Sequence, residues 1–191
     1  MNFFYEELPC TVHVHGKKIP IITDFREYIR LLDMLKCEEL NSMQRLTLLA
    51  QYFLYEIEVD KEAISALTEF VVMDFDSWQK GNEEDGIEPD RHGSNKNLYS
   101  YEMDYPFILS GFMRDYRIDL ESVEYLHWWK FRMLFDGLSE DTEIKQRIMY
   151  RSINLSDIKD KDERKRISRI QKRIQLPQES ITDYDIGNAF A

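Results

Sequence analysis

Cysteine, glycine and proline are all scarce in this sequence, which has 2, 7 and 5 of them among 191 residues. The two cysteines, Cys10 and Cys37, are too few for a disulfide framework, and neither lies in a CxxC spacing. We therefore expect a reduced, cytoplasmic setting. So few glycines and prolines indicate long uninterrupted elements, and hence a helical protein.

Long hydrophobic runs are also absent. No stretch approaches the ~20 apolar residues that a membrane-spanning helix requires. The first ten residues, MNFFYEELPC, lack both the basic region and the apolar run of a signal peptide. We therefore expect a soluble protein with no membrane partner.

The sequence does contain enough apolar and aromatic residues to build a core. Hydrophobic residues make up 43% and aromatic residues 13% of the chain, which argues against wholesale disorder. A globular chain of this length buries roughly 70% of its unfolded surface, so it needs neither a disulfide nor a metal to fold. The length fits one domain, or one domain with appendages.

The net charge of −11 is unevenly distributed along the chain. Residues 1–98 contain 10 Lys and Arg against 19 Asp and Glu, whereas residues 145–173 contain 11 basic and 4 acidic residues. An acidic front and a basic region near the end favour head-to-tail self-association or a charged partner, and they repel nucleic acid from most of the surface.

Periodicity predicts a mainly α fold, a bundle of about six to seven helices with a small N-terminal β-hairpin at residues 11–23 and a turn at Gly16-Lys17. The helices are expected at residues 24–40, 41–57, 60–78, 105–118, 119–135, 139–149 and 160–175. We divide the chain into residues 1–80 (hairpin and helices), a linker at 81–98, a C-terminal helical body at 99–177 and a polar tail at 178–191. These parts are expected to form one compact domain overall.

Two histidine arrangements could carry chemistry. His13 and His15 would share one strand face and could bind zinc, but no further ligand lies near them in sequence, so a solvated strand face is favoured. His127 could act as a general base, but no nucleophile pattern accompanies it, so a structural role is favoured. We expect no enzymatic activity, no cofactor and no metal.

The region around His127 is the densest in large side chains. On a helix, Trp128 and Phe131 would lie on one stripe and Trp129 on another, so the helix is either buried between neighbours or keeps one side for a partner. We take Trp128, Trp129 and Phe131 as candidates for a protein interaction, although packing accounts for most of this pattern.

The charged helix at 160–175 could contact nucleic acid phosphates. Its acidic residues interleave at helical spacing, as in Asp160–Arg164 and Asp162–Arg166, and it lacks aromatic side chains for stacking on bases. A solvated face or a protein-docking surface is therefore favoured, with Arg164, Arg166 and Arg169 as interaction candidates. A nucleic-acid-binding regulator that uses this helix is the alternative function.

Several motifs in the second half resemble a known family. They are DYRIDL at residues 115–120, LHWWKF at 126–131, LFxGL at 134–138, and the charged helix closed by Leu176-Pro177. Together they are similar to the phage protein family named for gene product fifteen of siphophages of Gram-positive hosts. The resemblance covers most of residues 100–177, and the N-terminal hairpin and first helix fit more loosely.

The resemblance implies a tail assembly chaperone, a non-enzymatic and mostly helical factor. Its expected partners are the tape-measure protein, the tail-tube protein and other copies of itself; nucleic acid is not expected. It would act in the cytoplasm of the bacterial host and would be absent from the mature virion. The family supplies no catalytic residues.

Overall fold

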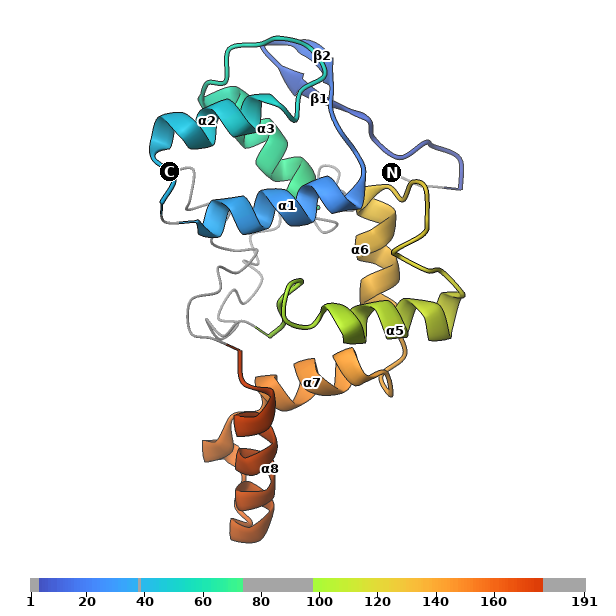
Figure 1. Cartoon of the computed structure of the whole chain (residues 1–191), viewed down its shortest axis with the longest axis vertical. Coiled ribbons are helices and arrows are strands. Elements are labelled where there is room, and N and C mark those ends of the chain that lie inside the picture. The colour runs from blue at the N-terminus through green and yellow to red at the C-terminus, as the bar shows by residue number, and fades with distance from the viewer. Residues whose placement is uncertain (1–3, 38, 74–97, 177–191) are drawn as a thin grey trace, which may run out of the picture. The chain divides into compact units, whose positions relative to one another are not determined.

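The computed structural model describes residues 4–37, 39–73 and 98–176 (Figure 1). The predicted linker at 81–98, apart from Leu98, and the predicted tail at 178–191 lie outside these residues. The described residues fall into two compact units. Unit 1 contains residues 4–73 together with 125–131, and unit 2 contains residues 98–124 and 132–176. Residues 125–131, which the sequence division assigned to the C-terminal body, thus belong with the N-terminal elements.

Seven α-helices and one two-stranded antiparallel sheet occur within the described residues, so the predicted mainly α fold with an N-terminal hairpin is confirmed. The strands are β1 (Thr11–Val14) and β2 (Lys17–Pro20). The helices are α1 (Phe25–Lys36), α2 (Ser42–Ala50), α3 (Lys61–Val72), α5 (Tyr105–Tyr116), α6 (Trp128–Asp136), α7 (Glu143–Ser152) and α8 (Lys161–Ile174), with a short 3-10 helix η1 (Leu155–Asp157). Helix α6 contributes residues to both units.

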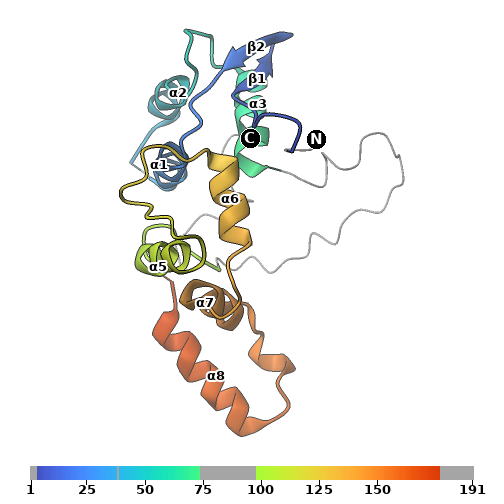
Figure 2. The ribbon, with the colours of Figure 1, turned by 90° about the vertical axis from the view of Figure 1, so that its right-hand side faces the viewer.

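The hairpin has a two-residue turn. Val14 pairs with Lys17, so the turn is His15-Gly16, one residue earlier than predicted. Both turn residues have positive φ, 51° for His15 and 70° for Gly16, as a type I′ turn requires. Val12 and Val14 are buried and His13 is exposed, so one face of β1 packs inward, next to α3 in Figures 1 and 2.

The chain at the end of β2 and just after it pairs with the segment that follows α2. The Ile22 N–H donates to Tyr52 O (2.9 Å), and the Leu54 N–H donates to Pro20 O (2.9 Å). This pairing corrects the predicted helix at 41–57, because α2 ends at Ala50 and Phe53 lies in a β-bridge with Ile21. A backbone bond to a distant segment overrides the helical periodicity there.

The first three helices begin at side-chain caps, at residues 24, 41 and 60, where the sequence predicted the helices to start. The Asp24 side chain accepts from the Arg26 N–H, Asn41 forms a capping box with Gln44, and Asp60 accepts from the Ala63 N–H. Each cap satisfies backbone donors that have no partner within the helix. These short-range signals fix where α1, α2 and α3 start.

Unit 2 is built around α5 and α7, and α8 packs beside α7 (Figure 2). Gly111 permits the close approach of α5 to the side chains of Leu138 and Ile144. A Cβ atom at position 111 would lie 3.2 Å from Leu138 Cδ1 and 3.7 Å from Ile144 Cγ2. Helix α8 contributes mainly one thin apolar stripe, of which Ile167 is the buried member. The remaining surface of α8 is therefore free to carry charge.

Candidate functional site

Helix α6 begins at Trp128, so the prediction of a helix over residues 119–135 is wrong for its first half. Within unit 1 the Phe25 N–H donates to Leu126 O (2.9 Å), and the Trp128 N–H donates to Thr23 O (2.7 Å). This pairing holds Leu126 and His127 in an extended conformation and therefore excludes a helix through them.

The two tryptophans join the start of α6 to the end of α3. Trp128 Nε1 donates to Val71 O (3.0 Å), and Trp129 Nε1 donates to Phe70 O (2.8 Å). Carbonyl groups in the last turn of a helix lack partners within that helix, so both indoles satisfy acceptors that burial would otherwise leave unpaired. The two side chains thus have a structural role in unit 1.

The three predicted interaction candidates of α6 are all interior. Trp128, Trp129 and Phe131 are exposed by only 0%, 2% and 1%. Phe131 stacks on Phe25 with ring centroids 4.7 Å apart. None of the three presents a surface to a partner in this structure, so the arginines of α8 are the candidates predicted from the sequence that remain.

His127 is buried, and both of its ring nitrogens are used by the backbone. Nδ1 accepts the Trp129 N–H (3.0 Å), as a helix N-cap does, so Nε2 must carry the proton that it donates to Pro9 O (3.0 Å). Desolvation lowers the pKa of His127 below its ordinary value of 6.5. A neutral imidazole engaged in this way has no free nitrogen with which to accept a substrate proton.

The two histidines of the hairpin are not brought together on one strand face, because His15 lies in the turn. Its Nε2 lies 3.0 Å from Asp60 Oδ2, and its Nδ1 lies 3.1 Å from Glu62 Oε2. Among the residues that the structure describes, no group of three or more His, Cys, Asp or Glu side chains is arranged to hold a metal ion. The contacts therefore link the turn to the start of α3.

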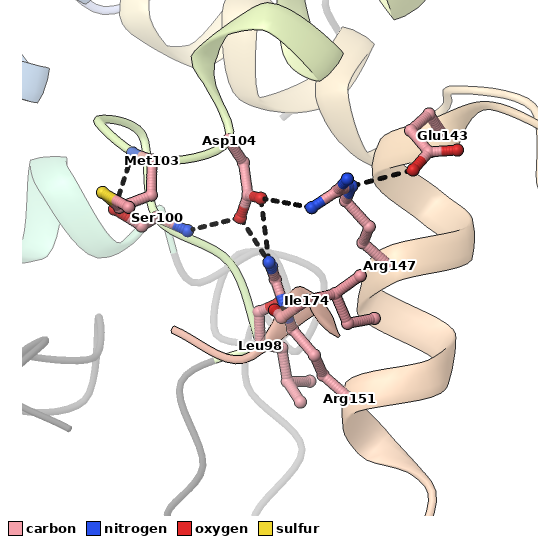
Figure 3. Close-up of polar contacts among 8 residues, drawn as sticks. All are labelled: Leu98, Ser100, Met103, Asp104, Glu143, Arg147, Arg151 and Ile174. Carbon is pink, nitrogen blue, oxygen red and sulfur yellow. Dashed lines mark hydrogen bonds and ion pairs between the residues drawn. The ribbon is translucent and has the colours of Figure 1, made fainter. Parts of the chain in front are cut away.

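A buried ion pair in unit 2 was not foreseen from the sequence (Figure 3). Arg151 of α7 donates from Nη2 to Asp104 Oδ1 (2.9 Å) and from Nη1 to Asp104 Oδ2 (2.5 Å). The two side chains are exposed by only 7% and 1%. Asp104 immediately precedes α5, yet its side chain makes no capping bond to that helix.

The remaining donors of Arg151 bind backbone carbonyls from both ends of the unit. Nε donates to Ile174 O (2.8 Å) in the last turn of α8, and Nη1 also donates to Leu98 O (2.9 Å). A positive charge at the C-terminal end of a helix is favourable. One side chain thereby fixes the end of α8 to α7 and to the chain that leads into α5.

A signal for this pair does exist in the sequence. Arg151 continues the apolar spacing of Ile144 and Ile148 on α7, at the i, i+4 and i+7 positions. A charged residue on the buried face of a helix requires a partner of opposite charge. The sequence does not say which carboxylate that is, because Asp104 lies 47 residues away.

The arginines of α8 differ in what they contact. Arg166 forms a bidentate ion pair with Glu163 (2.7 and 2.9 Å), which raises the pKa of the guanidinium. Arg164 Nε donates to Ile158 O (3.0 Å), which fixes the loop before the helix. These contacts replace the i, i+4 pairs that the sequence suggested. Arg169 is exposed, and among the described residues its Nε donates only a long bond, to Lys165 O (3.3 Å).

One side of α8 carries only basic side chains. We define the basic stripe as Lys161, Lys165, Arg169 and Lys172, which follow one another at intervals of three or four residues, and all four are exposed. The stripe lies on the side of the helix opposite the buried Ile167. It is therefore a cationic surface that faces solvent in unit 2.

Helix α5 exposes apolar side chains at helical spacing. We define the apolar stripe as Tyr105, Leu109 and Met113, at positions i, i+4 and i+8. Tyr105 is exposed by 43% and Met113 by 41%, and Leu109 is partly exposed. An exposed row of this kind suits contact with another apolar surface.

A model of one protein family, described as Bacteriophage Gp15 protein, matches residues 4–176 of the chain. No curated protein and no solved structure matches. No helix among the described residues is long and apolar enough to span a membrane. The family match covers every described residue of both units.

Proposed function

The chain belongs to the bacteriophage Gp15 protein family, and from this membership we propose that it is a tail assembly chaperone that binds the tape-measure protein. Membership itself indicates a phage structural or assembly-related protein. The observation that carries the proposal is the extent of the match, which runs through both units and is not confined to one motif. The more specific role rests on the resemblance of the motifs in residues 100–177.

The surface that we assign to the tape-measure protein is the apolar stripe of α5. A long helical partner with its own hydrophobic face could lie against Tyr105, Leu109 and Met113, since a helix binds through anchors spaced three or four residues apart. Methionine suits such a contact because its unbranched side chain adapts to irregular surfaces. The partly exposed stripe supports the proposal, because covering it would remove apolar surface from water.

The proposed role needs neither a cofactor nor catalysis. The structural use of both nitrogens of His127 supports this part, because that residue was the candidate general base. The protein would act in the host cytoplasm, assist the addition of tail-tube subunits and be left out of the mature virion. Major tail protein is accordingly a second proposed partner.

Co-expression with the tape-measure protein of the same phage tests the role. We expect more soluble tape-measure protein than in its absence, and capture of a complex through a tag on this chain. Co-expression with the major tail protein and with an unrelated helical protein gives the comparison. A tape-measure protein that stays insoluble and fails to co-purify at low salt would contradict the proposal, as would the presence of this chain in purified virions.

A further inference from the structure

The basic stripe of α8 is a site of uncompensated repulsion. Lys161, Lys165 and Arg169 follow one another one turn apart, and like charges at that spacing destabilise a helix. Lys161, Lys165 and Lys172 form no ion pair with any residue that the structure describes. Helix α8 contains two acidic residues, Asp162 and Glu163. Arg166 engages the carboxylate of Glu163, and Asp162 forms no ion pair with any residue that the structure describes, so one exposed carboxylate stands against the four cations of the stripe. An anionic surface placed against the stripe would relieve the repulsion.

Unit 1 presents a surface of the opposite kind. We define the acidic loop as residues 54–58, in which Glu56 and Glu58 are exposed beside Leu54 (60% exposed) and Tyr55 (66% exposed). The loop is held at both sides, because the Leu54 N–H donates to Pro20 O (2.9 Å) and Asp60 caps α3. Exposed apolar and acidic side chains are thus presented together on a fixed stretch of backbone.

The two surfaces match in spacing as well as in charge. Residues two apart, such as Glu56 and Glu58, can lie at most about 7 Å apart along the chain. Lys165 and Arg169 are separated by about 6 Å along the axis of α8. The two carboxylates can therefore face two successive basic side chains. The aliphatic stems of Lys and Arg can at the same time cover Leu54 and Tyr55.

From this complementarity we propose that the basic stripe of one copy binds the acidic loop of a second copy. The two surfaces lie in different units and differ from each other, so the contact is head-to-tail. Such contacts build rings if they close and open chains if they do not. The inference rests on α8 and the acidic loop alone and does not depend on the tape-measure protein.

Two charge-reversal variants of the full-length chain test the contact. K165E/R169E makes the stripe acidic, and E56K/E58K makes the loop basic. Each variant alone presents like charges at the contact, so each should self-associate at least about tenfold more weakly than the wild type. An equimolar mixture should associate again, because every surface then has a partner of opposite charge.

Sedimentation velocity gives the readout. The average mass of the wild type should rise with concentration at about 0.01 M salt, where the screening length is about 30 Å, and fall at about 1 M, where it is about 3 Å. R117E/K130E, which reverses two exposed basic residues that belong to neither surface, is the matched control and should associate as the wild type does. Circular dichroism checks that each variant is folded.

Three results would overturn the inference. The first is a wild-type chain that stays monomeric at low salt, and the second is a mixture of the two variants that fails to associate. The third is binding of duplex or single-stranded DNA that K165E/R169E abolishes while self-association is unchanged, since the stripe would then serve nucleic acid.

Discussion

Removing the Arg151 side chain should destabilise unit 2 more than any change to its exposed ion pairs. In R151M the carboxylate of Asp104, which is 1% exposed, loses both guanidinium donors and retains the Ser100 N–H (3.1 Å to Oδ2). Arg147 Nη1, at 4.0 Å from Asp104 Oδ1, is too distant to replace them without moving. Removing one partner of a buried pair costs about 3–5 kcal/mol. The substitution also leaves Leu98 O and Ile174 O without the guanidinium donors. We therefore expect the free energy of unfolding to fall by an amount near the upper end of that range.

Urea unfolding followed by circular dichroism at 222 nm measures this loss. With a slope of about 2 kcal/mol per M of urea, the unfolding midpoint should fall by about 1.5–2.5 M. R114M is the control and should have little effect, because Arg114 is 46% exposed and its partner Asp141 is 80% exposed. Its other partner, Asp115, is 11% exposed but keeps the Ser139 N–H (2.8 Å). The double variant D104L/R151M should recover much of the loss, since an apolar pair leaves no buried charge. Equal midpoints for R151M and R114M would refute the reasoning.

Three further predictions concern unit 1. W128F and W129F should each cost about 1–3 kcal/mol in urea unfolding, because each leaves a carbonyl of the last turn of α3 unpaired; a cost no larger than that of an exposed substitution would argue against the indole bonds. The pKa of His127 is lowered by burial, so stability should hold above pH 6.5 and fall as the pH drops below it, when the unfolded chain takes up the proton first. H127N, which can cap α6 without titrating, should lose less melting temperature between pH 7 and pH 5, and parallel losses would contradict this account of the histidine. N41A should cost about 1 kcal/mol in thermal unfolding through loss of the capping box of α2, whereas an unchanged melting temperature would show that the cap contributes nothing.

Local signals in the sequence were sufficient for most of the helices. The caps at Asp24, Asn41 and Asp60 depend on backbone groups no more than three residues away, so the sequence contains both partners. The thin apolar stripe of α8 was likewise visible in the spacing of its isoleucines. Membership in the Gp15 family was also predicted, from the motifs in the second half of the chain.

The helix predictions that failed concern segments whose hydrogen-bond partners lie far away in the sequence. The segment before Trp128 has helical periodicity, yet the backbone of Thr23 and Phe25, about a hundred residues earlier, holds it extended. The helix predicted through residue 57 ends early because Phe53 pairs with Ile21. Tertiary hydrogen bonds of this kind override local preference, and a single sequence does not show them.

The candidate site likewise has features that the sequence predicted and features that it did not. The sequence identified the region of Trp128 as a packing centre, but it could not tell which indole would be buried, because Val71 and Phe70, which accept their hydrogen bonds, lie more than 50 residues earlier. The basic character of α8 was evident from composition. Which of its arginines would be engaged could not be predicted, since Arg164 binds a backbone carbonyl of the preceding loop.

The most direct test of the proposed function is the affinity of the purified chain for its tape-measure protein, measured by isothermal titration calorimetry. M113E places a charge in the apolar stripe, and S110E places the same charge at an exposed position elsewhere on α5. If the stripe is the binding surface, M113E should bind at least about tenfold more weakly, which corresponds to about 1.4 kcal/mol, and S110E should bind as the wild type does. No measurable heat with the wild-type chain, or equal affinity for both variants, would contradict the account.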